Sequence, residues 1–341
     1  MARQTNRFLV TTEEEISKIN PENLDLINDF LNYLETTDHS PKSITVYKSN
    51  LNIFFVYLMK YVKNKDFVDI KKRDIMNWQN YLIKGGLSPA RIKVLKSTIS
   101  SLSIFIENIL DEEEKWEGFR NIVNKIPAPT SNEVREKTVL TDEELEMLLN
   151  KLVESNKIQI ALFVAMSAFS GSRKAETIQY KRSFFTDETC KSGLYVTPEI
   201  RTKGKGVAGK KLNKYCLKNK VDKYLELWDK EREIKGINID DLFVVKKKDK
   251  WQCATIATVN GWMDICSKIL EKPCYCHNFR HFFCSYLGRQ NLPISVIKDV
   301  VGHSSTNMTE HYIDNPKEDA FMKYFSEDGI KQVEQKGLSD L

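Results

Sequence analysis

The sequence has no apolar run long enough to cross a membrane. Charged residues interrupt each apolar stretch well before the roughly 18 residues that a membrane-spanning helix needs. Residues 1–7 are not followed by the long apolar core of a secretory signal. We therefore expect a cytoplasmic protein with no membrane partner.

Signs of a disulfide framework or a metal site are also lacking. The seven cysteines are odd in number and lie between Cys190 and Cys284, and a cytosolic chain of this size rarely uses disulfides. Cys274 and Cys276 are one residue apart and have no second pair, which disfavours zinc. We find no phosphate-binding glycine loop and no acidic metal cluster, and expect no cofactor. The net charge of +5 is too small to indicate a nucleic-acid partner by itself.

Histidine is scarce, and four of the five histidines lie after residue 276. His277 precedes Arg280 by three residues, His303 follows 26 residues after His277, and Tyr312 comes nine residues later. An arginine can hold a phosphate by two parallel hydrogen bonds, and an imidazole exchanges a proton near neutral pH. A tyrosine hydroxyl can act as a covalent nucleophile. Together these residues predict metal-free attack on a phosphodiester.

The alternative interpretation is that these residues are ordinary ones. A single His-x-x-Arg arises by chance, and a lone histidine is more often a surface or core residue. We keep that interpretation for His281 and His311. The joint spacing of the other residues favours a site.

The segments 277–281 and 301–305, followed by Tyr312, resemble the C-terminal signature of tyrosine recombinases, the phage-integrase and Xer-type family. That family has a further arginine upstream, in a Gly-Leu-Arg-x-x-Glu-like turn. Residues 170–176 supply this turn with Arg173, directly after an apolar stretch. The resemblance covers about residues 20–330, nearly the whole chain.

One departure from the family pattern is Ser172, which stands where the family has Leu or Met. We expect this small polar residue to loosen the local packing and to leave Arg173 and Glu176 in register. Glu176 is interpreted as a support for the turn rather than as a chemical group.

The resemblance implies a mainly α fold with a small β-sheet. A four-helix, SAM-like core-binding domain would precede a mixed α+β catalytic domain. The predicted ranges are an N-terminal extension (1–20), the helical DNA-binding domain (21–125), a linker (126–138), the catalytic domain (139–328) and a polar tail (329–341).

Apolar periodicity predicts the four N-terminal helices directly, over 23–34, from Pro41, over 71–84, and from Pro89 to Leu110. The two prolines in 126–132 indicate an exposed, extended linker, and Thr141 with Glu144 predicts a capping box. Five basic residues are expected outside the bundle, where they either form a solvated face or contact DNA phosphates: Lys42, Lys48, Arg91, Lys93 and Lys96.

Two short strands, 193–197 and 214–217, are predicted to flank a basic, glycine-rich tip over 201–211. The resemblance implies a catalytic lysine on this hairpin, and we favour Lys205 over Lys203. The alternative is that the loop is merely basic and solvated. Helices are then expected at 221–235, 255–270, 278–288, from Pro293 to Gly302, 307–313 and 319–325.

The resemblance implies a site-specific DNA recombinase, or integrase, that cuts and rejoins DNA through a 3′-phosphotyrosyl intermediate without ATP or metal. Arg173 and Arg280 would clamp the scissile phosphate. His277 would accept the proton of Tyr312 or orient the phosphate, and His303 would hydrogen-bond a phosphate oxygen. The hairpin lysine would protonate the leaving 5′ oxygen.

The implied partners are double-stranded DNA with inverted-repeat core sites, a homotetramer on two such sites, and an optional accessory directionality factor. Residues 320–325 would dock on a neighbouring protomer or on their own domain. The short stretch before the bundle favours a simple core-site recombinase, nucleoid-associated in a bacterium, phage or mobile element. The alternatives are a transposase, a telomere resolvase or type IB topoisomerase of the same chemistry, and an inactive DNA-binding derivative.

Overall fold

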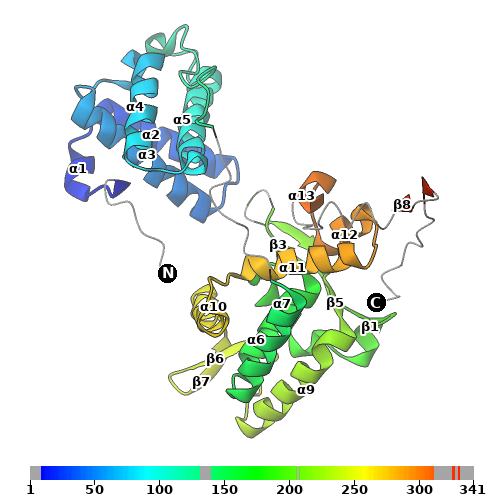
Figure 1. The fold of residues 1–341 in the computed structure, drawn as a ribbon. Helices are drawn as coiled ribbons and strands as arrows, with labels where there is room; N and C mark the ends of the chain where they lie inside the picture. Colours follow the sequence, from blue (N-terminus) through cyan, green and yellow to red (C-terminus); the bar gives the residue numbers. More distant parts are fainter. Residues whose placement is uncertain are drawn as a thin grey trace. The chain divides into compact units, whose positions relative to one another are not determined.

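The computed structural model describes residues 9–130, 140–204, 206, 208–310, 325–326 and 329–330. The chain divides into two compact units (Figure 1). Unit 1 comprises residues 1–136 and 204–208, and unit 2 comprises residues 137–203 and 209–341. Both units are mainly helical, and the second also has small antiparallel sheets. The predicted fold class is confirmed, whereas the predicted domain boundaries stay a prediction.

Unit 1 is a bundle of helices around one apolar core. Helices α3 and α5 begin with proline after a serine cap, because Ser40 and Ser88 accept hydrogen bonds from backbone N–H groups three residues on. Phe54 and Trp78 meet edge to face at the centre of the core, both fully buried. The elements are α1 (Glu13–Ser17), α2 (Pro21–Thr36), α3 (Pro41–Tyr61), η2 (Phe67–Asp69), α4 (Lys72–Lys84), α5 (Pro89–Ile109) and η3 (Glu114–Trp116).

A short helix, α1, precedes α2 and packs on the same core. Thr12 forms a capping box with Glu15 and starts α1. Ile16 packs against the core and Ile19 is buried within it. Glu15 also forms an ion pair with Lys60 of α3. Residues 12–19 are therefore part of this unit.

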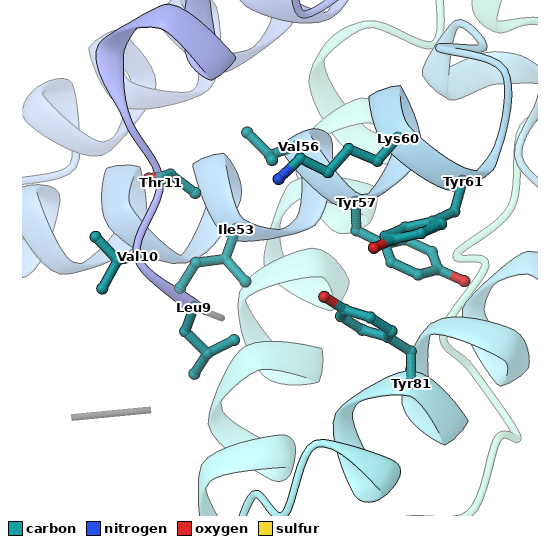
Figure 2. Close-up of a pocket in the computed structure, with 9 residues that line it drawn as sticks. All are labelled: Leu9, Val10, Thr11, Ile53, Val56, Tyr57, Lys60, Tyr61 and Tyr81. Atoms are coloured by element: carbon teal, nitrogen blue, oxygen red, sulfur yellow. The ribbon is translucent and has the colours of Figure 1, made fainter. Parts of the chain in front are cut away.

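A small pocket lies where α3 and α4 meet the residues before α1 (Figure 2). Three tyrosines gather beside it, with ring centroids 5.0 Å apart for Tyr57 and Tyr81 and 5.3 Å for the two pairs that include Tyr61. Burial raises the pKa of Tyr57 and of Tyr81. These contacts join α3 to α4, and we assign the pocket a structural role.

The prediction that Lys96 lies outside the bundle is wrong. Its side chain is buried, and its ammonium donates to Gln79 Oε1 at 2.6 Å and to the carbonyls of Ile126 and Pro127 at 3.0 and 3.1 Å. Burial lowers the pKa of Lys96. The start of the predicted linker is thereby fastened to α5, and Ile126 packs on the core instead of being exposed. The other four basic residues are exposed or partly exposed.

Unit 2 contains the second core and the hairpins. The predicted capping box is confirmed, because the Glu144 N–H donates to Thr141 Oγ1 and the Thr141 N–H donates to Glu144 Oε2. Its helical elements are α6 (Asp142–Glu154), α7 (Ile158–Ser170), α8 (Lys174–Thr177), η4 (Arg182–Phe184), η5 (Asp187–Thr189), α9 (Lys218–Ile234), α10 (Ile256–Leu270), α11 (Cys276–Arg289), α12 (Ile294–Val301) and α13 (Thr306–Glu310).

The strands are β1 (Cys190–Lys191), β2 (Leu194–Val196), β3 (Ile200–Thr202), β4 (Lys210–Leu212), β5 (Tyr215–Leu217), β6 (Val244–Lys247), β7 (Lys250–Cys253), β8 (Phe325–Ser326) and β9 (Gly329–Ile330). They form an antiparallel sheet in the order β1-β2-β5 and three two-stranded pairs, β3-β4, β6-β7 and β8-β9. The sequence did not predict the β6-β7 hairpin.

The two strands predicted around the basic hairpin are confirmed as β2 and β5, with Leu194 opposite Leu217. The predicted tip is too long, because β3 and β4 pair within it, with Ile200 opposite Leu212. Ile200 and Thr202 are buried and Arg201 between them is exposed, which is the alternation of a half-buried strand. Only residues 203–209 lie between these two strands in the sequence.

Helix α7 runs through the middle of unit 2 and contacts α6, α9 and α11 (Figure 1). Every residue of α7 except Gln159 is buried. A helix that is apolar on all sides is stable only when it is enclosed by other elements. Within the described part of the chain, no helix is both long and apolar enough to cross a bilayer.

We predict that Lys96→Ala lowers the free energy of unfolding by about 1–2 kcal/mol, because three charge-assisted hydrogen bonds are lost. Lys93→Ala, on the same helix but exposed, should change it by less than about 0.5 kcal/mol. Urea unfolding of both variants measures the difference. Equal stability of the two variants would contradict the anchoring role of Lys96.

Candidate active site

The turn after α7 places Arg173. Gly171 ends the helix with φ 61°, and an added Cβ there would lie 2.7 Å from Phe283 Cδ1 and 3.0 Å from Val301 Cγ1. Only glycine fits both this backbone conformation and this close approach. Arg173 then caps α8, its backbone N–H donating to Glu176 Oε2 and its Nη1 donating to Glu176 Oε1, both at 3.0 Å. The Arg173 side chain stays 28% exposed, so it can reach a ligand.

Ser172 does not loosen the packing, and that prediction is wrong. The residue is fully buried, and its hydroxyl lies 2.6 Å from the hydroxyl of Tyr180. Tyr180 donates to Ser170 Oγ, which also accepts from the backbone N–H of Ser172. The three hydroxyls form a small buried network that satisfies each polar group.

Arg280 lies on α11 and is fully buried. Its Nη1 donates to the carbonyl of Gly171 at 2.7 Å, and its Nε donates to His303 Nε2 at 3.2 Å. A buried guanidinium needs such partners because a desolvated charge is costly. One side chain thus joins three segments of the predicted signature.

His277 occupies the first turn of α11, because the helix begins at Cys276 and not at the predicted residue 278. It precedes Arg280 by three residues and is the more exposed of the two. Burial, and next the charges of Arg280 and Arg173, lower the pKa of His277. The imidazole is therefore neutral at physiological pH.

His303 follows the end of α12, as the sequence predicts. Gly302 stops the helix with φ 72°, and the His303 N–H donates to the carbonyl of Lys298. The imidazole is buried, with Nδ1 2.9 Å from Thr309 Oγ1. Burial and then the charge of Arg280 lower the pKa of His303 to about 3.

Four of the predicted site residues therefore gather in one cluster: Arg173, His277, Arg280 and His303. Lys203 follows β3 and is exposed, and no hydrogen bond joins it to the described residues of this cluster. Lys205 and Tyr312 lie outside the described residues, as does most of the predicted segment 320–325.

Sequence reasoning missed Lys214. Its side chain is 1% exposed, and its Nζ lies 2.8 Å from Oε2 of Glu176, which is 2% exposed. The missed signal was periodicity, because Lys214 precedes buried Cys216 by two residues along an extended segment. The segment therefore turns Lys214 toward the core.

The pKa values of this ion pair follow from its burial. Burial lowers the pKa of Lys214, and the nearby Arg280 and Arg173 lower it further, although Glu176 opposes this. Burial raises the pKa of Glu176, but the charge and hydrogen bond of Lys214 outweigh it and the pKa is lowered. The carboxylate is therefore ionised.

The seven cysteines are free thiols. Burial raises the pKa of Cys274 to about 12 and of Cys276 to about 11. Among the described residues, no group of three or more histidine, cysteine or acidic side chains is arranged to hold a metal ion.

Two family models match the chain. The model described as "Phage integrase family" matches residues 138–319, and "Phage integrase, N-terminal SAM-like domain" matches residues 7–116. The first match contains the cluster formed by Arg173, His277, Arg280 and His303, and also Tyr312.

Relatives and solved structures agree with these matches. The SPbeta prophage-derived recombinase-like protein YomM of Bacillus subtilis is 27% identical over 307 residues, covering 88% of this chain and 90% of that protein. The XerH site-specific recombinase bound to difH substrate has a TM-score of 0.65 at 21% identity, covering 89% of this chain and 96% of that one. A lambda integrase tetramer bound to a Holliday junction has a TM-score of 0.61 at 19% identity, covering 85% of this chain and 76% of that one.

Each of these structures is less than 25% identical to the chain and supports its fold. The first family model spans more than half of the sequence and contains all four residues of the cluster described above. The chain therefore belongs to the phage integrase family of tyrosine recombinases.

Proposed function

We propose that the chain is a site-specific recombinase that cuts one DNA strand by attack of Tyr312 on a phosphodiester. Family membership makes it an enzyme that breaks and rejoins DNA. The observation that carries the proposed site is the placement of Arg280, which is buried and hydrogen-bonded to both Gly171 and His303. This arrangement supports a single binding site for a phosphate.

In the proposed reaction, Arg173 and Arg280 hold the non-bridging oxygens of the scissile phosphate. Guanidinium groups match phosphate by parallel hydrogen bonds, and their charge has most effect where negative charge develops in the pentacoordinate transition state. Fixed hydrogen bonds to Glu176 and Gly171 support this role, because they orient the two groups before the substrate arrives.

The two histidines differ in their proposed roles. The Nε–H of Arg280 can only donate, so Nε2 of His303 accepts and Nδ1 carries the proton toward Thr309. In this arrangement His303 orients Arg280. His303 can donate to a phosphate oxygen only when its Nε2 is protonated, which requires that the bound phosphate raise the pKa of the imidazole. His277, neutral and exposed, is suited to accept the proton of Tyr312.

The proposed step breaks the bond from phosphorus to the 5′ oxygen and forms a bond from phosphorus to the Tyr312 oxygen. Lys203 or Lys205 donates a proton to the leaving 5′ oxygen. A 5′ hydroxyl of another strand then attacks the phosphotyrosine, which reverses the step and releases Tyr312.

The proposed substrate is double-stranded DNA with inverted core sites, and the proposed assembly is a homotetramer on two sites. Two similar structures support this, since XerH is bound to difH and lambda integrase forms a tetramer on a Holliday junction.

We predict that Tyr312→Phe abolishes covalent attachment to a nicked suicide substrate, because only the nucleophilic hydroxyl is removed. DNA binding by gel shift should stay within about twofold, since the phosphate contacts remain. Tyr324→Phe is the control and should still be trapped. Peptide mapping that finds the DNA on a residue other than Tyr312 would contradict the assignment.

Arg280→Lys should slow cleavage by at least about 100-fold, because the charge is kept but the two-pronged hydrogen bonding is lost. The same loss is expected for Arg173→Lys. Arg289→Lys, on the same helix and paired with Asp142 at the surface, is the matched control and should cleave normally. Single-turnover rates measure the effect, and a near-normal rate for Arg280→Lys would rule out the clamp.

The lowered pKa of His303 predicts acid sensitivity. Its folded-state pKa of about 3 lies below its ordinary value of 6.5, so the folded state binds fewer protons than the unfolded state between these values. Stability should be complete above about pH 6.5 and fall as the pH decreases toward 3. His303→Asn should decline less steeply, as measured by melting temperature at pH 7 and pH 5. His39→Asn is the control and should lose as much melting temperature between pH 7 and pH 5 as the wild type. The same loss in His303→Asn would contradict the assignment.

A further inference from the structure

The carboxylate of Glu176 serves two cations at once. Its Oε1 accepts from Arg173 Nη1 at 3.0 Å, and its Oε2 accepts from the Arg173 backbone N–H and lies 2.8 Å from Lys214 Nζ. Both Glu176 and Lys214 are almost completely buried. The ion pair is therefore shielded from solvent and from screening by salt.

Lys214 is fixed in this position by its backbone. Its N–H donates to Thr197 Oγ1 at 2.9 Å, and its carbonyl accepts from the Thr197 N–H at 2.9 Å. Its ammonium also borders the loop that contains His303, because a Cβ added to Gly302 would lie 3.6 Å from Nζ. Lys214 thus belongs to the same cluster as the proposed phosphate ligands.

The charges of this cluster pose a physical problem. An ionised carboxylate 3.0 Å from the guanidinium of Arg173 offsets its charge and repels a phosphate. The two histidines have lowered pKa values and add no positive charge. With Lys214 present, the negative charge of Glu176 is balanced within the protein, and both guanidinium charges remain for the substrate.

Resting on the proposed function, we propose that Lys214 is a positioning residue that balances the charge of Glu176 and so leaves Arg173 available to the scissile phosphate. Glu176 can then orient Arg173 without neutralising it. Lys214 acts through Glu176 and transfers no proton. Two other roles make different predictions: a purely structural ion pair, and a general acid that protonates the leaving oxygen.

The test is a double-mutant cycle with Lys214→Met and Glu176→Gln, read out as the rate of single-turnover cleavage of a suicide substrate. Lys214→Met should slow cleavage by about 100-fold, the size of effect seen when one stabilising group is lost. Adding Glu176→Gln removes the unbalanced charge, so the double variant should cleave at least about tenfold faster than Lys214→Met. A purely structural ion pair predicts instead that Lys214→Met cleaves at the normal rate whenever circular dichroism shows it to be folded. That result, or a double variant as slow as Lys214→Met, would overturn the proposal.

A substrate with a bridging 5′ sulfur separates charge balance from proton donation, because a thiolate leaves without a proton. Lys214→Met should be slow on this substrate too. Rescue of Lys214→Met by sulfur would make Lys214 the general acid and would overturn the proposal. We expect the sulfur substrate to restore the cleavage rate of either Lys203→Ala or Lys205→Ala, and not that of Lys214→Met.

Two controls keep the test decisive. Lys218→Met breaks a partly exposed ion pair with Asp222 and should cleave normally. If circular dichroism shows that Lys214→Met does not fold, cleavage is measured on the double variant alone. Replacing both partners of a buried pair by neutral groups is tolerated far better than removing one. It should then cleave within about tenfold of the wild type, and slower cleavage would overturn the proposal. Wild-type protein that forms no covalent complex would instead refute the proposed function.

Discussion

The hydrogen bond from Arg280 to the carbonyl of Gly171 holds together two segments that lie 109 residues apart in the sequence. Loss of this hydrogen bond would leave a buried charge with one partner fewer, so a shift of α11 relative to the end of α7 is costly. The left-handed conformation of Gly171 presents that carbonyl and leaves room for Phe283 and Val301. This contact joins α11, which carries His277, to the turn that leads to Arg173.

Local signals in the sequence were sufficient for much of the fold. Prolines in first helical turns, the capping box at Thr141 and the apolar periodicity of α5 depend on residues a few positions apart. The spacing of the two histidines and two arginines also brought together residues that do form a cluster. Lys205 and Tyr312 stay predictions, because they lie outside the described residues.

The failures concern polar residues whose partners lie outside their own helix or turn. Lys96 looks like a solvated helix residue until its contacts with Ile126 and Pro127 are known. Ser172 resembles a packing defect until the hydroxyl of Tyr180 is placed beside it. Periodicity reports which face of an element is apolar, but it does not report which buried polar group is satisfied by a partner elsewhere.

The enclosure of α7 has a consequence for the motions of the protein. Because almost every residue of this helix is buried, it has no face on which to fray independently of its neighbours. The turn that carries Arg173 follows it directly and is held by the buried hydroxyls of Ser170, Ser172 and Tyr180. Backbone amides from α7 through this turn should exchange with solvent deuterium only on global unfolding of the unit, so the proposed phosphate ligand Arg173 is carried on one of the most slowly opening parts of the molecule.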